Sequence, residues 1–79
     1  MRNRVLALMG EKQSKENRSI NAAIVARETG LTRQAISKWV RGEVSEFRED
    51  TIERLCGYFD CEIGELLYLE KENEQSSQN

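Results

Sequence analysis

Residues 22–41, AAIVARETGLTRQAISKWVR, contain two short helical patterns that meet at Gly30. The two patterns lie too close together for anything except a tight bend, and a glycine tolerates the positive φ that such a turn needs. Thr32 is a good N-cap for the second pattern. We therefore expect one helix at residues 22–29, a tight turn, and a second helix at residues 33–41. This arrangement predicts a helix-turn-helix.

The second predicted helix has two chemically different faces. Ile36 and Trp39 place apolar bulk on one face at spacing i, i+3, which indicates contact with a core. Arg33 begins the other face, and its guanidinium can donate to both O6 and N7 of a guanine. This polar face carries side chains of the kind that read base edges in the DNA major groove, namely Arg33, Gln34, Ser37 and Lys38. DNA binding is therefore the leading hypothesis.

The rest of the chain predicts three further helices, at about residues 2–12, 49–59 and 62–69. Polar stretches at residues 13–19 and 43–48 predict loops. Proline is absent, and no segment shows the period-two alternation that is typical of a strand. The predicted fold class is all-α, with five short helices around one core. In the first helix we expect an apolar stripe of Val5, Leu6, Leu8 and Met9.

Length and hydropathy limit the organisation of the chain. A chain of 79 residues with 38% hydrophobic residues can form one small domain, which we place at residues 1–69. Residues 70–79 contain no apolar side chain and predict a disordered tail. No segment is long enough to span a membrane, and the apolar run after Arg4 is too short for a signal peptide. We therefore expect a cytoplasmic protein.

The net charge of −2 hides a strong asymmetry along the chain. Residues 1–48 carry ten Lys and Arg against five Asp and Glu, whereas residues 49–79 carry two against nine. The predicted helix-turn-helix lies in the basic part. Such an asymmetry fits a protein that turns one face toward phosphates and the other toward solvent.

The residues that usually carry catalysis are scarce. The chain has no His, so a Ser or Cys nucleophile lacks its usual base, and no glycine-rich phosphate loop is present. We expect no enzyme activity, no cofactor and no metal. Cys56 and Cys61 are expected to be small hydrophobic residues in or near the core, with a redox or ligand-sensing role as the alternative.

These residues together resemble the lambda-repressor-like, xenobiotic-response-element (XRE) family of transcriptional regulators. The resemblance covers about residues 4–69, and residues 55–56 and 61–67 match the family's fourth and fifth helices. The matching positions in the helix-turn-helix are Ala26, Gly30, Leu31, Ile36, Trp39 and Gly42. Members are mostly phage and bacterial repressors or activators that bind operators as dimers.

The resemblance implies base contacts by the four polar residues of the second motif helix, and phosphate contacts at the start of both motif helices. The chain departs from the family at Ala22, where many members have Gln, and at Glu43 and Glu46, in a loop that is usually basic. The loop before Ile20 is longer than usual, and its cations are candidates to replace the missing contacts. The full set of predicted phosphate contacts is Arg4, Arg18, Asn21, Arg27, Thr32, Arg41 and Arg48.

We thus expect a sequence-specific transcriptional regulator of double-stranded DNA, acting as a repressor. A homodimer would place two copies of the 33–41 helix about 34 Å apart on a palindromic operator. Its predicted contact is the apolar segment Leu66, Leu67, Tyr68 and Leu69. The alternative is a protein-interaction module, such as an antitoxin-like or adaptor subunit, which the acidic C-terminal part favours. A regulatory protein partner is compatible both with a transcriptional regulator and with a protein-interaction module.

Overall fold

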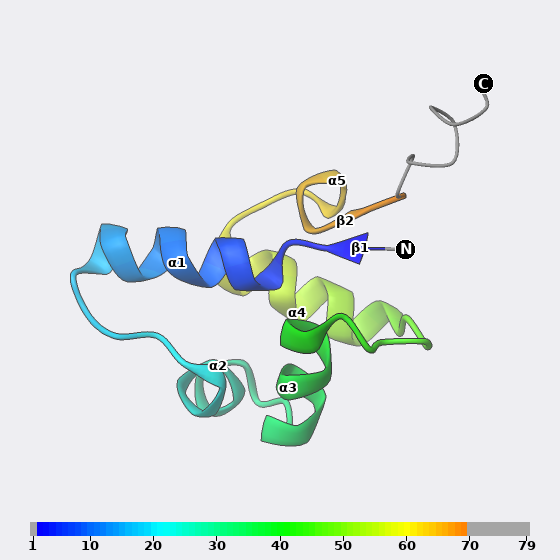
Figure 1. Cartoon of the computed structure of the whole chain (residues 1–79), viewed down its shortest axis with the longest axis horizontal. Coiled ribbons are helices and arrows are strands. Elements are labelled where there is room, and N and C mark those ends of the chain that lie inside the picture. The colour runs from blue at the N-terminus through cyan, green and yellow to red at the C-terminus, as the bar shows by residue number, and fades with distance from the viewer. Residues whose placement is uncertain (1, 70–79) are drawn as a thin grey trace.

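The structure is a computed structural model and describes residues 2–69. In Figure 1, α2 and α3 lie together at the bottom, α1 and α4 occupy the middle, and α5 lies at the top. The five helices over residues 2–69 confirm the predicted all-α class, to which a minor two-stranded sheet is added. The elements in chain order are β1 (Arg2–Asn3), α1 (Val5–Glu16), α2 (Ala22–Thr29), α3 (Arg33–Arg41), α4 (Glu49–Phe59), α5 (Ile63–Leu66) and β2 (Leu67–Tyr68).

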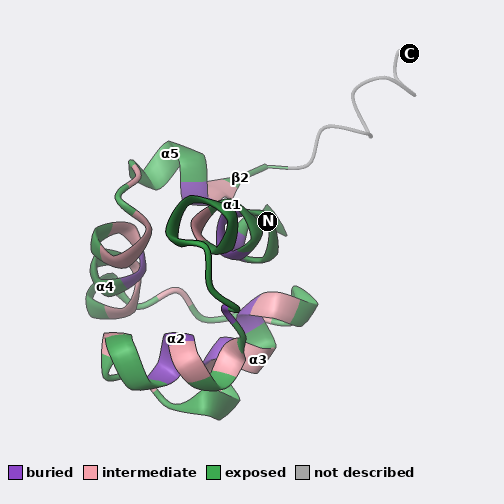
Figure 2. Cartoon of the chain, turned by 90° about the vertical axis from the view of Figure 1, so that its left-hand side faces the viewer, coloured by how far each residue is buried: buried purple, intermediate pink, exposed green. Residues whose placement is uncertain are grey.

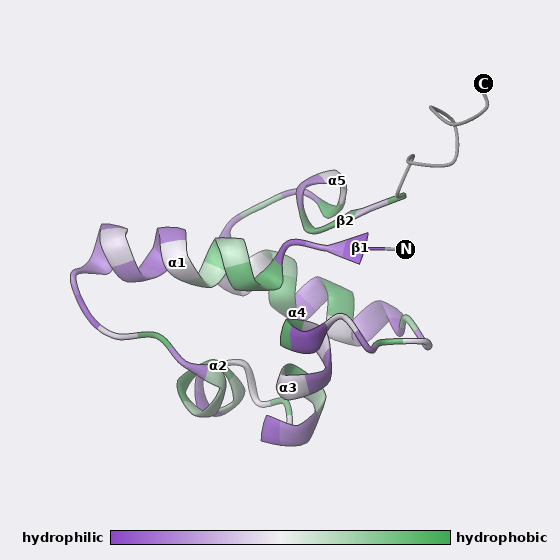
Figure 3. Cartoon of the chain, in the orientation of Figure 1, coloured by the Kyte–Doolittle hydropathy of each residue, from purple (hydrophilic) through white to green (hydrophobic). Residues whose placement is uncertain are grey.

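One core joins all five helices. Figures 2 and 3 show that the buried and hydrophobic parts of the helices face one another across the interior. Among residues 2–69 no polar or charged residue is buried. Leu6, which we predicted in the apolar stripe of the first helix, is instead 61% exposed, because it lies off the face that α1 turns to the core. The buried core residues are Val5, Leu8, Met9, Ile20, Val25, Ala26, Ile36, Trp39, Leu55 and Leu66.

The middle of the chain folds with the predicted bounds. Helices α2, α3 and α4 begin and end where their caps and periodicity place them, and residues 43–48 form a loop without regular secondary structure, as predicted. None of the helices in residues 2–69 has the length and apolar character that a membrane crossing requires. The predicted tail at residues 70–79 lies outside the described residues.

The first and last described segments of the chain form a small antiparallel sheet that was not predicted. Arg2 lies opposite Tyr68, and Asn3 lies opposite Leu67. Because residues 67 and 68 are extended, the prediction of a last helix over residues 62–69 was wrong in its second half. Strand pairing here joins two segments that are more than 60 residues apart in sequence, so no local periodicity could reveal it.

Helix α1 begins and ends later than predicted. It begins at Val5, whose N–H donates to Oδ1 of Asn3 over 3.0 Å. It then runs past the predicted end at Lys12 as far as Glu16, and the stretch after Lys12 is therefore mostly helix rather than loop. An ion pair of 2.7 Å between Nζ of Lys12 and Oε2 of Glu16 spans this extra turn. Asn17, with φ 55°, ends the helix in the left-handed region.

Candidate nucleic-acid interface

The turn between α2 and α3 depends on Gly30, as predicted. Its φ is 82°, and its N–H donates to the carbonyl of Ala26 over 2.9 Å. A Cβ atom at this position would lie 2.8 Å from Nη1 of Arg54. That guanidinium donates to the carbonyl of Thr29 over 2.8 Å, so α4 holds the end of α2 directly. Both the backbone conformation and the close approach of Arg54 therefore favour glycine.

Helix α3 is anchored on its inner face and at its C-terminal end. Ile36 is fully buried, and Trp39 is 4% exposed and packs edge-to-face against Phe47 with ring centroids 5.8 Å apart. The carbonyl of Trp39 accepts a hydrogen bond of 3.0 Å from Nδ2 of Asn3 in β1. Asn3 was not predicted, since its partner is distant in sequence and no local motif marks it. These contacts fix which face of α3 points outward.

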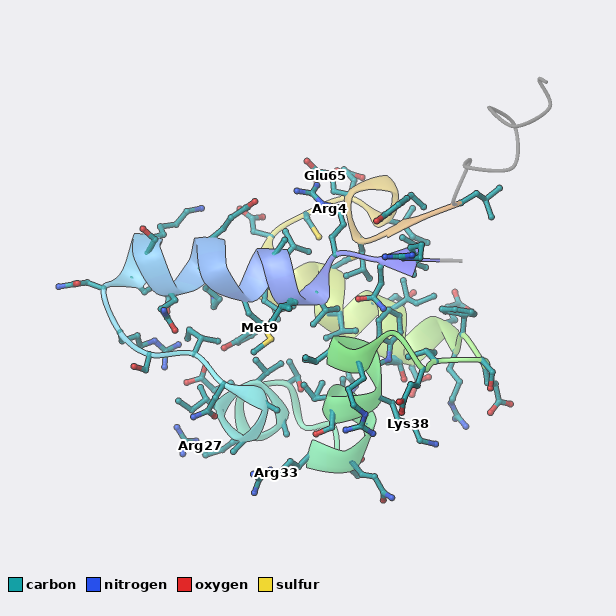
Figure 4. The ribbon with its side chains drawn as sticks, viewed as in Figure 1. Arg4, Met9, Arg27, Arg33, Lys38 and Glu65 are labelled. Carbon is teal, nitrogen blue, oxygen red and sulfur yellow. The ribbon has the colours of Figure 1, made fainter. Side chains whose placement is uncertain are left out.

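The outward face of α3 carries the four predicted base-contact residues. Arg33, Gln34 and Lys38 are exposed, while Ser37 is half-buried. Within residues 2–69, the side chains of Arg33 and Lys38 form no hydrogen bond or ion pair. Figure 4 shows Arg33 extending from the start of α3, on the side of the molecule away from α5, with Arg27 of α2 on the same side. The hydrogen-bond donors of this face are therefore available to an external acceptor.

Two predicted phosphate contacts cap the motif helices. Oδ1 of Asn21 accepts from the N–H of Ile24 over 2.9 Å, and Oγ1 of Thr32 accepts from the N–H of Ala35 over 3.0 Å. Capping uses only an acceptor of each side chain, so the amide of Asn21 and the hydroxyl of Thr32 keep donors for a phosphate oxygen. Both lie at helix N-termini, where the helix dipole favours an anion.

Three further predicted phosphate contacts are arginines in or next to α2 and α3, and they differ in whether they form an ion pair. Arg27 is exposed and forms no ion pair within residues 2–69. Nε of Arg41 lies 3.0 Å from Glu43, and Nε of Arg48 lies 3.4 Å from Asp50. These two exposed pairs contribute little stability, so a phosphate can compete for either arginine. Arg48 and Lys38 line one open cleft of about 190 Å³ between α3 and the 43–48 loop.

Arg18 makes intramolecular contacts that differ from its predicted phosphate contact. Its guanidinium donates to both carboxylate oxygens of Glu28 over 2.8 and 2.9 Å, and to Glu16 over 2.8 Å. The hydroxyl of Tyr58 donates to the same Glu28 over 2.6 Å. This cluster joins the end of α1, α2 and α4. Arg18 therefore supports the position of α2, and its charge is matched by two carboxylates.

Arg4 is separated from the other predicted phosphate contacts. Figure 4 shows it beside Glu65, near α5 and on the opposite side of the molecule from Arg33 in this view. Nη2 of Arg4 lies 3.7 Å from Oε2 of Glu11. The structure thus does not bring Arg4 to the outward face of α3.

The pKa values of the Glu28 cluster make it sensitive to acid. The hydrogen bonds from Arg18, and then from Tyr58, lower the pKa of Glu28 from 4.5 to about 2. Burial, followed by the hydrogen bond to Glu28, raises the pKa of Tyr58 to about 12. A carboxyl group whose pKa is lower in the folded state stabilises the fold above its ordinary pKa. This contribution is lost as the pH falls from 4.5 toward 2.

We expect Glu28→Gln to be less stable than the wild type near neutral pH and to lose less stability on acidification. The difference between the two proteins should shrink as the pH falls from 4.5 toward 2. Urea unfolding at several pH values measures the free energies. Glu46→Gln, in the exposed 43–48 loop, is the matched control and should follow the wild-type profile. A constant difference between Glu28→Gln and the wild type at all pH values would contradict this assignment.

The predicted dimer segment is only partly on the surface. Leu66 is fully buried in the core of its own chain, and its side chain therefore offers no surface for the predicted dimer contact. Leu67 is half-buried because it packs against the core beside Asn3. Tyr68 and Leu69 are 45% and 64% exposed. Among residues 2–69 no cluster of His, Cys, Asp or Glu is suited to hold a metal ion.

Helices α2 and α3 are joined by a tight turn at Gly30, and α3 carries exposed cationic and amide side chains on its outward face. This arrangement is that of a helix-turn-helix DNA-binding protein. A family model of the Cro/C1-type HTH DNA-binding domain matches residues 15–72, and the chain therefore belongs to this family. The match confirms the resemblance found in the sequence and assigns a general function in DNA binding and transcription regulation. No curated protein and no solved structure matches the chain.

Proposed function

We propose that the protein is a sequence-specific transcriptional repressor that places α3 in the DNA major groove. This proposal rests on the side chains of Arg33 and Lys38, which have no hydrogen-bond or ion-pair partner within residues 2–69. Arg33 enters the groove first and donates to a guanine, while Gln34 contacts an adenine or a phosphate. Ser37 is small enough to let the helix approach closely. Occupation of an operator excludes other proteins from the same DNA, which supports repression.

The phosphate contacts in this proposal surround α3. The side chains of Asn21 and Thr32 donate to phosphate oxygens from the two helix N-termini. Arg27 contacts the backbone from α2, and Arg41 and Arg48 contact it after exchanging their carboxylate partners for phosphates. These interactions fix the position of α3 without reading sequence.

We further propose a homodimer on a palindromic operator, with Tyr68 and Leu69 in the contact. Tyr68 lies in β2 and Leu69 follows it directly, and both side chains are exposed. A twofold contact there would place two α3 helices on successive turns of one DNA face, about 34 Å apart. We expect two chains per operator at saturation in analytical ultracentrifugation. One chain per operator at all concentrations would contradict the dimer.

Binding across salt concentrations tests the function itself. Sites are first selected from a random oligonucleotide pool, and affinity is then measured by fluorescence anisotropy. Three cationic phosphate contacts per chain, by Arg27, Arg41 and Arg48, make about six in the proposed dimer and give a slope of about −5 for log K against log salt concentration. The matched variant Glu43→Gln releases Arg41 from its ion pair and should bind more tightly at every salt concentration. Absence of DNA affinity at about 50 mM salt would contradict DNA binding.

A protein-interaction module is the second candidate function. Glu43 and Glu46 are exposed and line the same cleft as Lys38, so a mixed-charge surface lies beside α3. Such a surface suits a charged protein partner. A module of this kind would show no salt-dependent DNA affinity in the experiment above, whereas the proposed repressor would.

A further inference from the structure

The turn between α4 and α5 brings the two cysteines of the chain together. Asp60 has φ 54° and ends α4 in the left-handed region. The N–H groups of Asp60 and Cys61 both donate to the carbonyl of Cys56, over 3.0 Å in the case of Cys61. In this type of helix end, the side chains at the positions of Cys56 and Cys61 are commonly neighbours, and here the thiol of Cys61 lies within hydrogen-bond reach of Cys56. Both thiols are free.

We propose that Cys56 and Cys61 form a reversible redox site, which a small disulfide such as oxidised glutathione converts to an intramolecular disulfide. Both side chains are half-buried at the edge of the core. They also line an open cleft of about 310 Å³ together with Gly57 and Glu62, so a small reagent can reach them. This site is independent of the proposed DNA contacts.

The reaction proceeds by two thiol–disulfide exchanges. The Cys56 thiolate attacks one sulfur of the reagent, forms a mixed disulfide and releases the first reagent thiolate. The Cys61 thiolate then attacks the sulfur of Cys56 and releases the second. The protein thiols lose two electrons and two protons, and one reagent disulfide gains them as two thiols.

The environment of Cys61 favours Cys56 as the first nucleophile. Burial, and then the neighbouring Cys56, raises the pKa of the Cys61 thiol to about 11. Cys61 is therefore a poor first nucleophile, since the thiolate is the reactive form.

The disulfide would lock the last turn of α4. That turn carries Tyr58, whose hydroxyl donates to Glu28 of α2. Oxidation should therefore stabilise the contact between Tyr58 of α4 and Glu28 of α2, which holds the helix-turn-helix in place. It should leave the outward face of α3 uncovered. Neither Cys56 nor Cys61 lies on the outward face of α3. We therefore expect oxidation to change DNA affinity by no more than about twofold.

The test uses the full chain in glutathione buffers of graded redox ratio. Samples are trapped by alkylation, and the fraction of disulfide is measured by mass spectrometry. The disulfide should be at least about tenfold more stable in native protein than in denaturing urea, a difference of about 1.4 kcal/mol. The oxidised protein should then melt at a higher temperature than the reduced protein, by thermodynamic linkage.

Single cysteine variants test the order of attack. Cys61→Ser should form a mixed disulfide at Cys56 faster than Cys56→Ser forms one at Cys61. Equal disulfide stability in native and unfolded chains would overturn the proposal. Two mixed disulfides in the native wild type, in place of the internal bond, would also overturn it.

Discussion

Trp39→Ala is expected to lower the free energy of unfolding by about 3–5 kcal/mol. The indole is 4% exposed and packs edge-to-face against Phe47, so its removal leaves a cavity in the core beneath α3. A domain of this size has little more stability than that to lose. The variant should therefore be largely unfolded near room temperature and should lose DNA binding as a consequence of unfolding.

Urea unfolding followed by circular dichroism measures this loss. Trp39→Phe is the matched variant, because it keeps an aromatic ring next to Phe47 and should cost less. Gln34→Ala, on the outward face of the same helix, should leave stability nearly unchanged. A loss below about 1 kcal/mol for Trp39→Ala would mean that the indole does not support the core.

Arg33→Ala is expected to weaken binding to the selected operator by about 1–3 kcal/mol, which is roughly 5- to 150-fold. The reason is the loss of two hydrogen bonds to one guanine. The variant should also tolerate other bases at that one position. Its stability should match the wild type, since Arg33 is exposed and has no partner within residues 2–69.

Two variants separate base reading from simple charge. Arg33→Lys keeps the charge but not the paired donors, so it should lose discrimination at the same base pair. Arg27→Ala removes a proposed phosphate contact from α2, and it should weaken binding to all sequences alike. An equal loss for Arg33→Ala on operator and random DNA would show that Arg33 contacts only phosphate.

The helix-turn-helix could be predicted because its signals lie within a few residues of one another. Thr32 accepts from the N–H of Ala35, and Gly30 adopts the left-handed conformation, so both mark the turn locally. The spacing of Ile36 and Trp39 assigned the inner face of α3 and thereby the outward face as well. The DNA contacts of that outward face remain predictions.

The polar residues near the start of the chain show where local patterns fail. The stretch after Lys12 has a loop-like composition, yet it is helical as far as Glu16. Arg18 is a reasonable phosphate contact by charge, yet its guanidinium binds Glu28 of α2. Composition gives the charge of a side chain but not its partner, and the partner here comes from another element.

The sequence by itself determined the helix-turn-helix, its turn at Gly30 and the two faces of α3, because caps and apolar spacing act over one or two helical turns. Only the tertiary structure decided the β1–β2 sheet, the hydrogen bond from Asn3 to Trp39 and the cluster of Arg18, Glu28 and Tyr58. These contacts join residues that are far apart in the chain. Which partners meet depends on how the helices pack around the core, and no local pattern records that.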